Sequence, residues 1–305
     1  MLSNSFEVTD FVKYFEKKSE EYGFKYAAIW GNHDRHGLYH PNWLAKQFRK
    51  AKNCFYYEPN DDLYGRSNFI INLTENGEKT SAVKWQIANL DSGASFSESP
   101  MSPFRDYDYI RKDQTQWWLA EHENARPTSG TDRGVPGIAY YHIPQDENLK
   151  MYNERASHKN KFFKLEDFAD NGSEEYESDF IDVAIKNNLK GAFMGHAHNV
   201  DWTVEMTDAD TGNTLKLGLG VKTGIELYYA HIDINTNEEA VKKGLDSLDD
   251  VYPAAIDKNF DLIGASLVVI TDVEDNIEGK FDLYHLYLNE KEREPEGYNR
   301  WWVKF

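Results

Sequence analysis

Gly31-Asn32-His33-Asp34, Tyr140-Tyr141-His142-Ile143-Pro144 and Gly195-His196-Ala197-His198 are the stretches of this sequence that decide its fold. Each of these three loop motifs follows an apolar run that is typical of a buried strand. Each also carries imidazole, amide or carboxylate groups that bind a metal ion or a phosphate. Because a rigid sheet fixes the loops that leave its strands, the pattern predicts a site at the ends of three strands.

Each motif taken alone also has an interpretation that needs no metal site. His196 and His198 can point into one metal site from an extended loop, but a pair of surface histidines is an equally good interpretation of His-x-His alone. His142 by itself is more typical of a core or rim histidine, and the residues 31–34 are also typical of a turn. All three motifs occur in order, each after a strand, and this combination favours a metal site over chance.

Composition and charge narrow the function classes. The chain has 305 residues, 40% hydrophobic and 14% aromatic, which is enough for a sizeable core. It carries 52 acidic against 34 basic side chains, a net charge of −18. Nucleic-acid binding relies on Lys and Arg at phosphates, so no nucleic-acid partner is expected. A local basic pocket could still hold a small phosphate. No membrane partner is expected, because no run approaches the ~18 consecutive apolar residues of a membrane span.

The cysteine content and the first residues give little information about the cellular compartment. Cys54 has no partner for an intramolecular disulfide, and a small buried hydrophobe is the favoured interpretation. One cysteine leans towards a reducing, cytoplasmic compartment, and residues 1–7 lack a signal-peptide pattern. The localisation is therefore left open.

Hydrophobic periodicity predicts an α/β chain in which helices alternate with strands early and hairpins dominate late. We expect one domain over 1–305, with polar insertions near 146–178 and 228–260. The mixture favours two mixed β-sheets packed as a sandwich with helices outside. Helices are predicted over 8–22, from about 41, over 113–123 and over 179–188. Strands are predicted over 25–30, 69–73, 84–90, 137–141, 191–194, 202–206, 214–219, 262–271 and 280–288, and a loop over 92–105.

In this order, the three loop motifs resemble the calcineurin-like metallophosphoesterase family. Residues 90–93 followed by 114–119 are similar to the strand and helix between two family motifs. Residues 137–144 are especially similar to purple-acid-phosphatase-like members, and residues 262–266 resemble a strand near the end of those proteins. The resemblance implies the four-layer fold of that family and a phosphatase that uses a metal-bound hydroxide at a dinuclear centre.

The resemblance also implies a role for each motif residue. Asn32, His142 and His196 would bind the second metal ion, and His198 would bind the first. His33 would lie over the substrate phosphate, stabilise its charge or protonate the leaving oxygen, and Asp34 would orient His33. The implied cofactors are two divalent or mixed-valence ions of Fe, Mn or Zn.

Half of the family's metal site is absent from this sequence. Family members begin with Asp-x-His and Gly-Asp, yet no Gly-Asp occurs here, and the only Asp-x-His, at 34–36, lies inside the first loop motif. We therefore expect an N-terminally truncated chain, a separate polypeptide that supplies the missing half, or a degenerate relative. Little activity is expected from the chain alone. The alternatives are an inactive binding or scaffold relative, and a phosphodiesterase acting on nucleotides.

Overall fold

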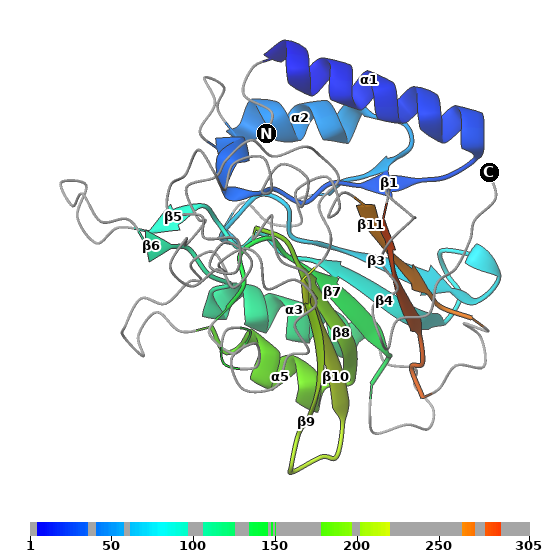
Figure 1. Cartoon of the computed structure of the whole chain (residues 1–305). Coiled ribbons are helices and arrows are strands. Elements are labelled where there is room, and N and C mark those ends of the chain that lie inside the picture. The colour runs from blue at the N-terminus through cyan, green and yellow to red at the C-terminus, as the bar shows by residue number, and fades with distance from the viewer. Residues whose placement is uncertain are drawn as a thin grey trace, which may run out of the picture.

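Six strands form the central sheet of the computed structural model (Figure 1). The structure describes residues 5–35, 41–57, 62–96, 106–125, 134–145, 148, 150, 178–196, 202–219, 264–271 and 278–287. The strand order is β3-β4-β7-β8-β10-β9, in which four central parallel strands are flanked by antiparallel β3 and β9. The strands are β3 (Phe69–Thr74), β4 (Val83–Asn89), β7 (Gly137–Tyr140), β8 (Leu189–Met194), β9 (Trp202–Thr207) and β10 (Thr214–Leu219).

Two helices cover one face of this sheet. They are α3 (Lys112–Asn124) and α5 (Phe180–Lys186), and their apolar side chains join the largest buried cluster. Trp118 and Phe180 meet edge to face there, with ring centroids 5.4 Å apart. Small alanines of the parallel strands, such as Ala139 and Ala192, let the helices approach closely.

A two-stranded sheet packs its apolar side chains against the other face. Strands β11 (Gly264–Val269) and β12 (Asp282–Tyr287) pair antiparallel. Phe281, just before β12, meets Phe193 of β8 with ring centroids 6.0 Å apart, in a cluster with the buried Trp85 and Ile138. The mixed α/β class is thus confirmed, with one mixed six-stranded sheet and smaller sheets, while the sandwich of two mixed sheets stays a prediction.

The N-terminal part forms a separate apolar cluster. Helices α1 (Ser5–Tyr22) and α2 (Pro41–Lys50) lie beside a short parallel pair, β1 (Tyr26–Ala27) and β2 (Cys54–Phe55) (Figure 1). Val8 of α1 and Phe48 of α2 are buried in this cluster together with Trp30. Since β1 pairs with only two residues of β2, the predicted strand 25–30 ends at Ala27, and the chain then turns into the 3-10 helix Asn32–Arg35.

The remaining elements agree with the sequence within a few residues, with one correction. The predicted helices and strands from residue 41 to residue 288 are all present, and the turn at 75–78 joins β3 and β4 antiparallel. The predicted loop 92–105 is wrong in part, because β5 (Ser95–Phe96) pairs with β6 (Asp106–Tyr107). A two-residue strand is too short to show a period.

Some predictions fall on residues that the structure leaves out. Most of the expected insertion 146–178 and all of 228–260 lie outside the described residues, as does His198. The single-domain prediction stays untested. Within the described part of the chain, no helix is long and apolar enough to cross a membrane.

Candidate metal centre

The parallel strands deliver two of the predicted ligands to one edge of the sheet. Tyr140 of β7 is paired with Phe193 of β8, and both chains continue side by side beyond the strands. The Tyr141 amide donates to the Phe193 carbonyl at 3.1 Å, and the Gly195 amide donates to the His142 carbonyl at 3.1 Å. His142 and His196 are therefore neighbours, with ring centroids 5.3 Å apart and an interplanar angle of 80°.

The first loop motif brings a third predicted ligand to the same place. Asn32 begins the 3-10 helix after β1, and its side chain is 4% exposed. Its Oδ1 lies 2.9 Å from Nε2 of His142, although the two residues are 110 positions apart in sequence. Asn32, His142 and His196, which we call the Asn-His-His cluster, thus lie together, with His142 in contact with both other residues. Their role as metal ligands stays a prediction.

The other residues of the first loop motif lie beside this cluster. His33 follows Asn32 in the same 3-10 helix and is half-buried. Asp34 accepts a hydrogen bond at its Oδ2 from the Gly31 amide at 2.9 Å, so its carboxylate closes the turn. The predicted contact of Asp34 with His33 stays a prediction.

His196 has an unusual backbone. Its φ is +72°, and its side chain is only 5% exposed. A left-handed conformation costs a residue with a Cβ about 1–2 kcal/mol, and surrounding structure holds such residues most often at functional sites. The cost fits a role in which this imidazole must be aimed at a fixed point.

Tyr107 is a site residue that the sequence did not reveal. It belongs to the two-residue strand β6, and its ring meets the His196 imidazole edge to face, with centroids 4.2 Å apart. Its ring also joins a small apolar cluster with Tyr109 and Ile143. A tyrosine without a surrounding motif gives no signal in a single sequence, so only the fold identifies it.

Two glycines enclose the imidazole of His142. A Cβ added to Gly31 would lie 3.0 Å from its Cε1 and 3.1 Å from its Nε2, and one added to Gly195 would lie 3.2 Å from its Nδ1. All three distances are shorter than ordinary carbon contacts. The glycine that begins the first and third loop motifs is therefore needed for close packing of the ring.

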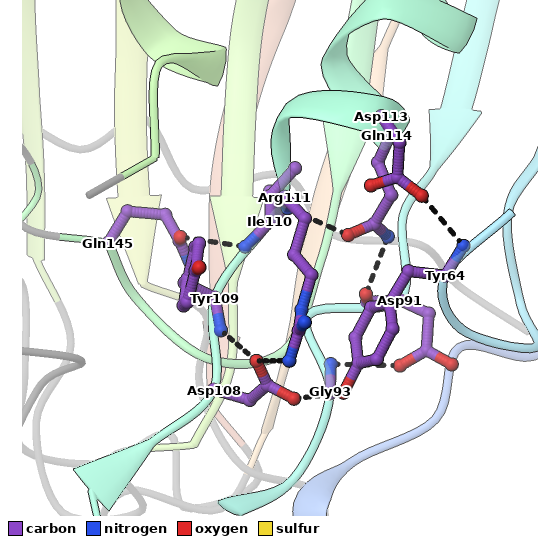
Figure 2. A network of polar contacts seen from close by, with 10 residues as sticks. All are labelled: Tyr64, Asp91, Gly93, Asp108, Tyr109, Ile110, Arg111, Asp113, Gln114 and Gln145. Atoms are coloured by element: carbon purple, nitrogen blue, oxygen red, sulfur yellow. Dashed lines mark hydrogen bonds and ion pairs between the residues drawn. The ribbon is translucent and has the colours of Figure 1, made fainter. Parts of the chain in front are cut away.

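A buried polar network supports the same edge of the sheet from the end of β4 (Figure 2). Asp91, which is fully buried, accepts hydrogen bonds from the amides of Gly93 at 3.0 Å and Arg66 at 2.6 Å. Gln114 of α3 donates to the Asp91 carbonyl at 2.7 Å and also to Oδ1 of Asn68. Satisfied buried networks of this kind rigidify their surroundings.

A charged pair closes the other side of this network. Nη2 of Arg111 lies 3.3 Å from Oδ1 of Asp108, whose Oδ2 accepts a hydrogen bond from the Tyr64 hydroxyl (Figure 2). The guanidinium also lies 3.8 Å from the centre of the Tyr64 ring. Burial is the largest single influence on the pKa of Arg111 and acts to lower it. The charge and hydrogen bond of Asp108 and the nearby Tyr64 and Tyr109 together outweigh burial, so the pKa is raised. The guanidinium therefore stays charged.

The Asn-His-His cluster fits one transition-metal ion by its donor chemistry. One amide oxygen and two imidazoles suit Zn, Fe or Mn. Across the described residues, no group of three or more His, Cys, Asp or Glu side chains could hold a metal ion, so this cluster has only two such residues beside its amide. The residues present thus fit one of the two ions that the sequence predicted.

Comparison with known proteins gives one relationship. No protein-family model matches the chain. Over 194 residues the chain is 25% identical to a protein of Arabidopsis thaliana named probable inactive purple acid phosphatase 29, and the match covers 59% of this chain and 47% of that protein. The chain is a distant homologue of that protein and spans about half of its length.

Proposed function

We propose that the chain is a calcineurin-like metallophosphoesterase of the purple-acid-phosphatase-like kind, in which Asn32, His142 and His196 hold one divalent transition-metal ion. The observation that carries the proposal is the 2.9 Å approach of Asn32 Oδ1 to His142 Nε2 beside the His196 ring. The distant relationship to a protein named as a purple acid phosphatase supports the same family. A second ion bound by His198 is proposed only because the resembled family binds two ions.

The charges of the ligands determine what such a site does. All three side chains are neutral donors, so a bound ion keeps its positive charge and attracts phosphoryl oxygens. When bound, the ion would neutralise negative charge that develops on a phosphoester. His33, adjacent to Asn32, is the proposed proton donor to the leaving oxygen, and Asp34 is proposed to orient it. The substrate class is a small phosphoester or a phosphoprotein.

We infer that hydrolysis by this chain is slow. The sequence contains no Gly-Asp, from which the family takes the carboxylate that bridges its ions. The similar Arabidopsis thaliana protein is itself named probable inactive. These two observations favour a second candidate function, a phosphate-binding protein of the same fold that hardly turns over.

Metal content and turnover of the purified chain test the proposal. We expect one bound Zn, Mn or Fe per chain by inductively coupled plasma mass spectrometry, and near-background hydrolysis of p-nitrophenyl phosphate. His196→Ala should lose the ion, whereas the matched control His122→Ala should keep it, because His122 is buried against Trp118 and Gln86. Phosphate binding by calorimetry without turnover would favour the second candidate.

Two results contradict the proposal. If the wild-type chain bound no metal in a stoichiometric amount, the proposed metal site would be wrong. Two tightly bound ions with robust turnover would show that the chain holds a complete dinuclear centre, against the single-ion site proposed here.

A further inference from the structure

The backbone amides and carbonyls of His142 and Ile143 are all hydrogen-bonded. The His142 amide donates to Ser92 Oγ at 3.2 Å, and the Ile143 amide donates to the same oxygen at 2.8 Å. The His142 carbonyl accepts from the Gly195 amide, and the Ile143 carbonyl accepts from Gln145 Nε2 at 2.6 Å. Two side chains, Ser92 and Gln145, therefore fix the backbone that carries the His142 imidazole.

Ser92 is well placed to hold this loop still. It is fully buried and follows Asp91 just beyond β4, the strand that pairs with β7. The pairing continues past the strand, since the Leu90 amide donates to the Tyr140 carbonyl at 2.9 Å. Asp91 next to Ser92 is in turn held by the buried network of Figure 2 through its carboxylate and its carbonyl. Its amide donates to Asn68 Oδ1 at 3.0 Å.

We propose that the Ser92 hydroxyl is a positioning group that aims the His142 imidazole at Asn32. One oxygen accepts from two consecutive amides, so it sets the orientation of the peptide planes on both sides of the His142 Cα. The glycines on either side of the ring leave it little room to compensate for a rotated backbone. Both hydrogen bonds join Ser92 to backbone amides, so it acts through the backbone of His142.

The link to metal binding rests on the proposed function, whereas the link to the His142 ring does not. A supporting residue that orients a metal ligand commonly changes metal affinity by about 10- to 100-fold when it is removed. Ser92 is expected to act at the lower end of that range, because Gln145 and the Gly195 amide still hold the loop.

The first experiment needs no metal. Ser92→Ala is compared with Ser178→Ala, a matched control in which another buried serine loses a bond from a backbone amide, that of Phe180 at 3.2 Å. In ¹⁵N-histidine-labelled apo protein, Ser92→Ala should shift or broaden the His142 imidazole resonances, assigned with His142→Gln. Ser178→Ala should leave them unchanged. Unchanged His142 resonances in Ser92→Ala, or equal changes in both variants, would overturn the proposal.

The second experiment measures Co²⁺ and Zn²⁺ affinity by calorimetry and by the visible spectrum of the Co²⁺ protein. Ser92→Ala should weaken binding about tenfold, and Ser178→Ala by less than twofold. Wild-type affinity in Ser92→Ala would refute the link to metal binding. If the wild-type chain binds neither ion, the proposed function fails, and the resonances of His142 still decide the role of Ser92.

A second variant covers the case in which Ser92→Ala does not fold. Ser92→Cys keeps a side chain of similar shape but replaces the hydroxyl by a weak acceptor. It should perturb the same His142 resonances to a smaller degree. Wild-type resonances in folded Ser92→Cys would refute the proposal.

Discussion

Replacing Gly31 by alanine tests the packing of the proposed centre most directly. The new Cβ would lie 3.0, 3.1 and 3.3 Å from Cε1, Nε2 and Cδ2 of His142. Carbon contacts are optimal at about 3.5–4.0 Å, so the ring must move away by roughly 0.5 Å. Gly195 also lies close to the ring, since a Cβ added there would be 3.2 Å from Nδ1. This closeness limits the movement of the ring.

The magnitude follows from this crowding. Overpacking of a filled site costs about 1–3 kcal/mol, which Gly31→Ala should lose from the free energy of unfolding of the metal-free chain. A shift of roughly 0.5 Å would also lengthen the 2.9 Å approach of Nε2 to Asn32 Oδ1 beyond good hydrogen-bonding distance. We expect metal affinity to fall about tenfold, which is about 1.4 kcal/mol.

Urea denaturation of the apo protein and calorimetric Zn²⁺ titration measure the two quantities. Gly77→Ala is the control: its φ is +70°, and nothing lies within 4 Å of an added Cβ. It should cost about 1 kcal/mol from backbone strain alone and leave metal affinity unchanged. Wild-type stability and affinity in Gly31→Ala would refute the reasoning, because the His142 ring would then not pack against Gly31.

Three further outcomes are expected elsewhere in the chain. Gly93→Ala combines a φ of +77° with a Cβ only 2.3 Å from Oδ2 of Asp108, and it should lower the free energy of unfolding in urea by about 2–5 kcal/mol. Trp118→Ala removes a ring that is 1% exposed and packed on Phe180, so a loss of about 3–5 kcal/mol is expected in the same assay, and a loss below about 1 kcal/mol would contradict the described core. Burial, with the charge of Glu16, raises the pKa of the Cys54 thiol to about 12. Its reaction with a disulfide reagent should therefore be slow at pH 8 and accelerate up to about pH 12. An unfolded thiol titrates near pH 8.5, so the free energy of unfolding should fall as the pH rises above about 8.5.

The order of helices and strands was largely predictable because the sequence signals for them are local. Short windows of sequence show the apolar runs that become β4, β7 and β8 and the periodic face of α1. The strands β5 and β6 were missed because two residues show no period. Tyr107 was missed because it lies in one of these short strands and its contact with His196 joins segments that are distant in sequence.

The sequence by itself determined which residue types could serve as ligands, and that each loop motif follows a strand. Only the tertiary structure decided that Asn32, His142 and His196 meet, because a contact across 110 positions depends on the parallel order of the sheet and on the turn after β1. It also decided that Ser92 accepts from the His142 and Ile143 amides and that the two glycines lie against the His142 ring. Hydrogen bonds and close packing of this kind are made between distant segments, and no local pattern encodes the distance between them.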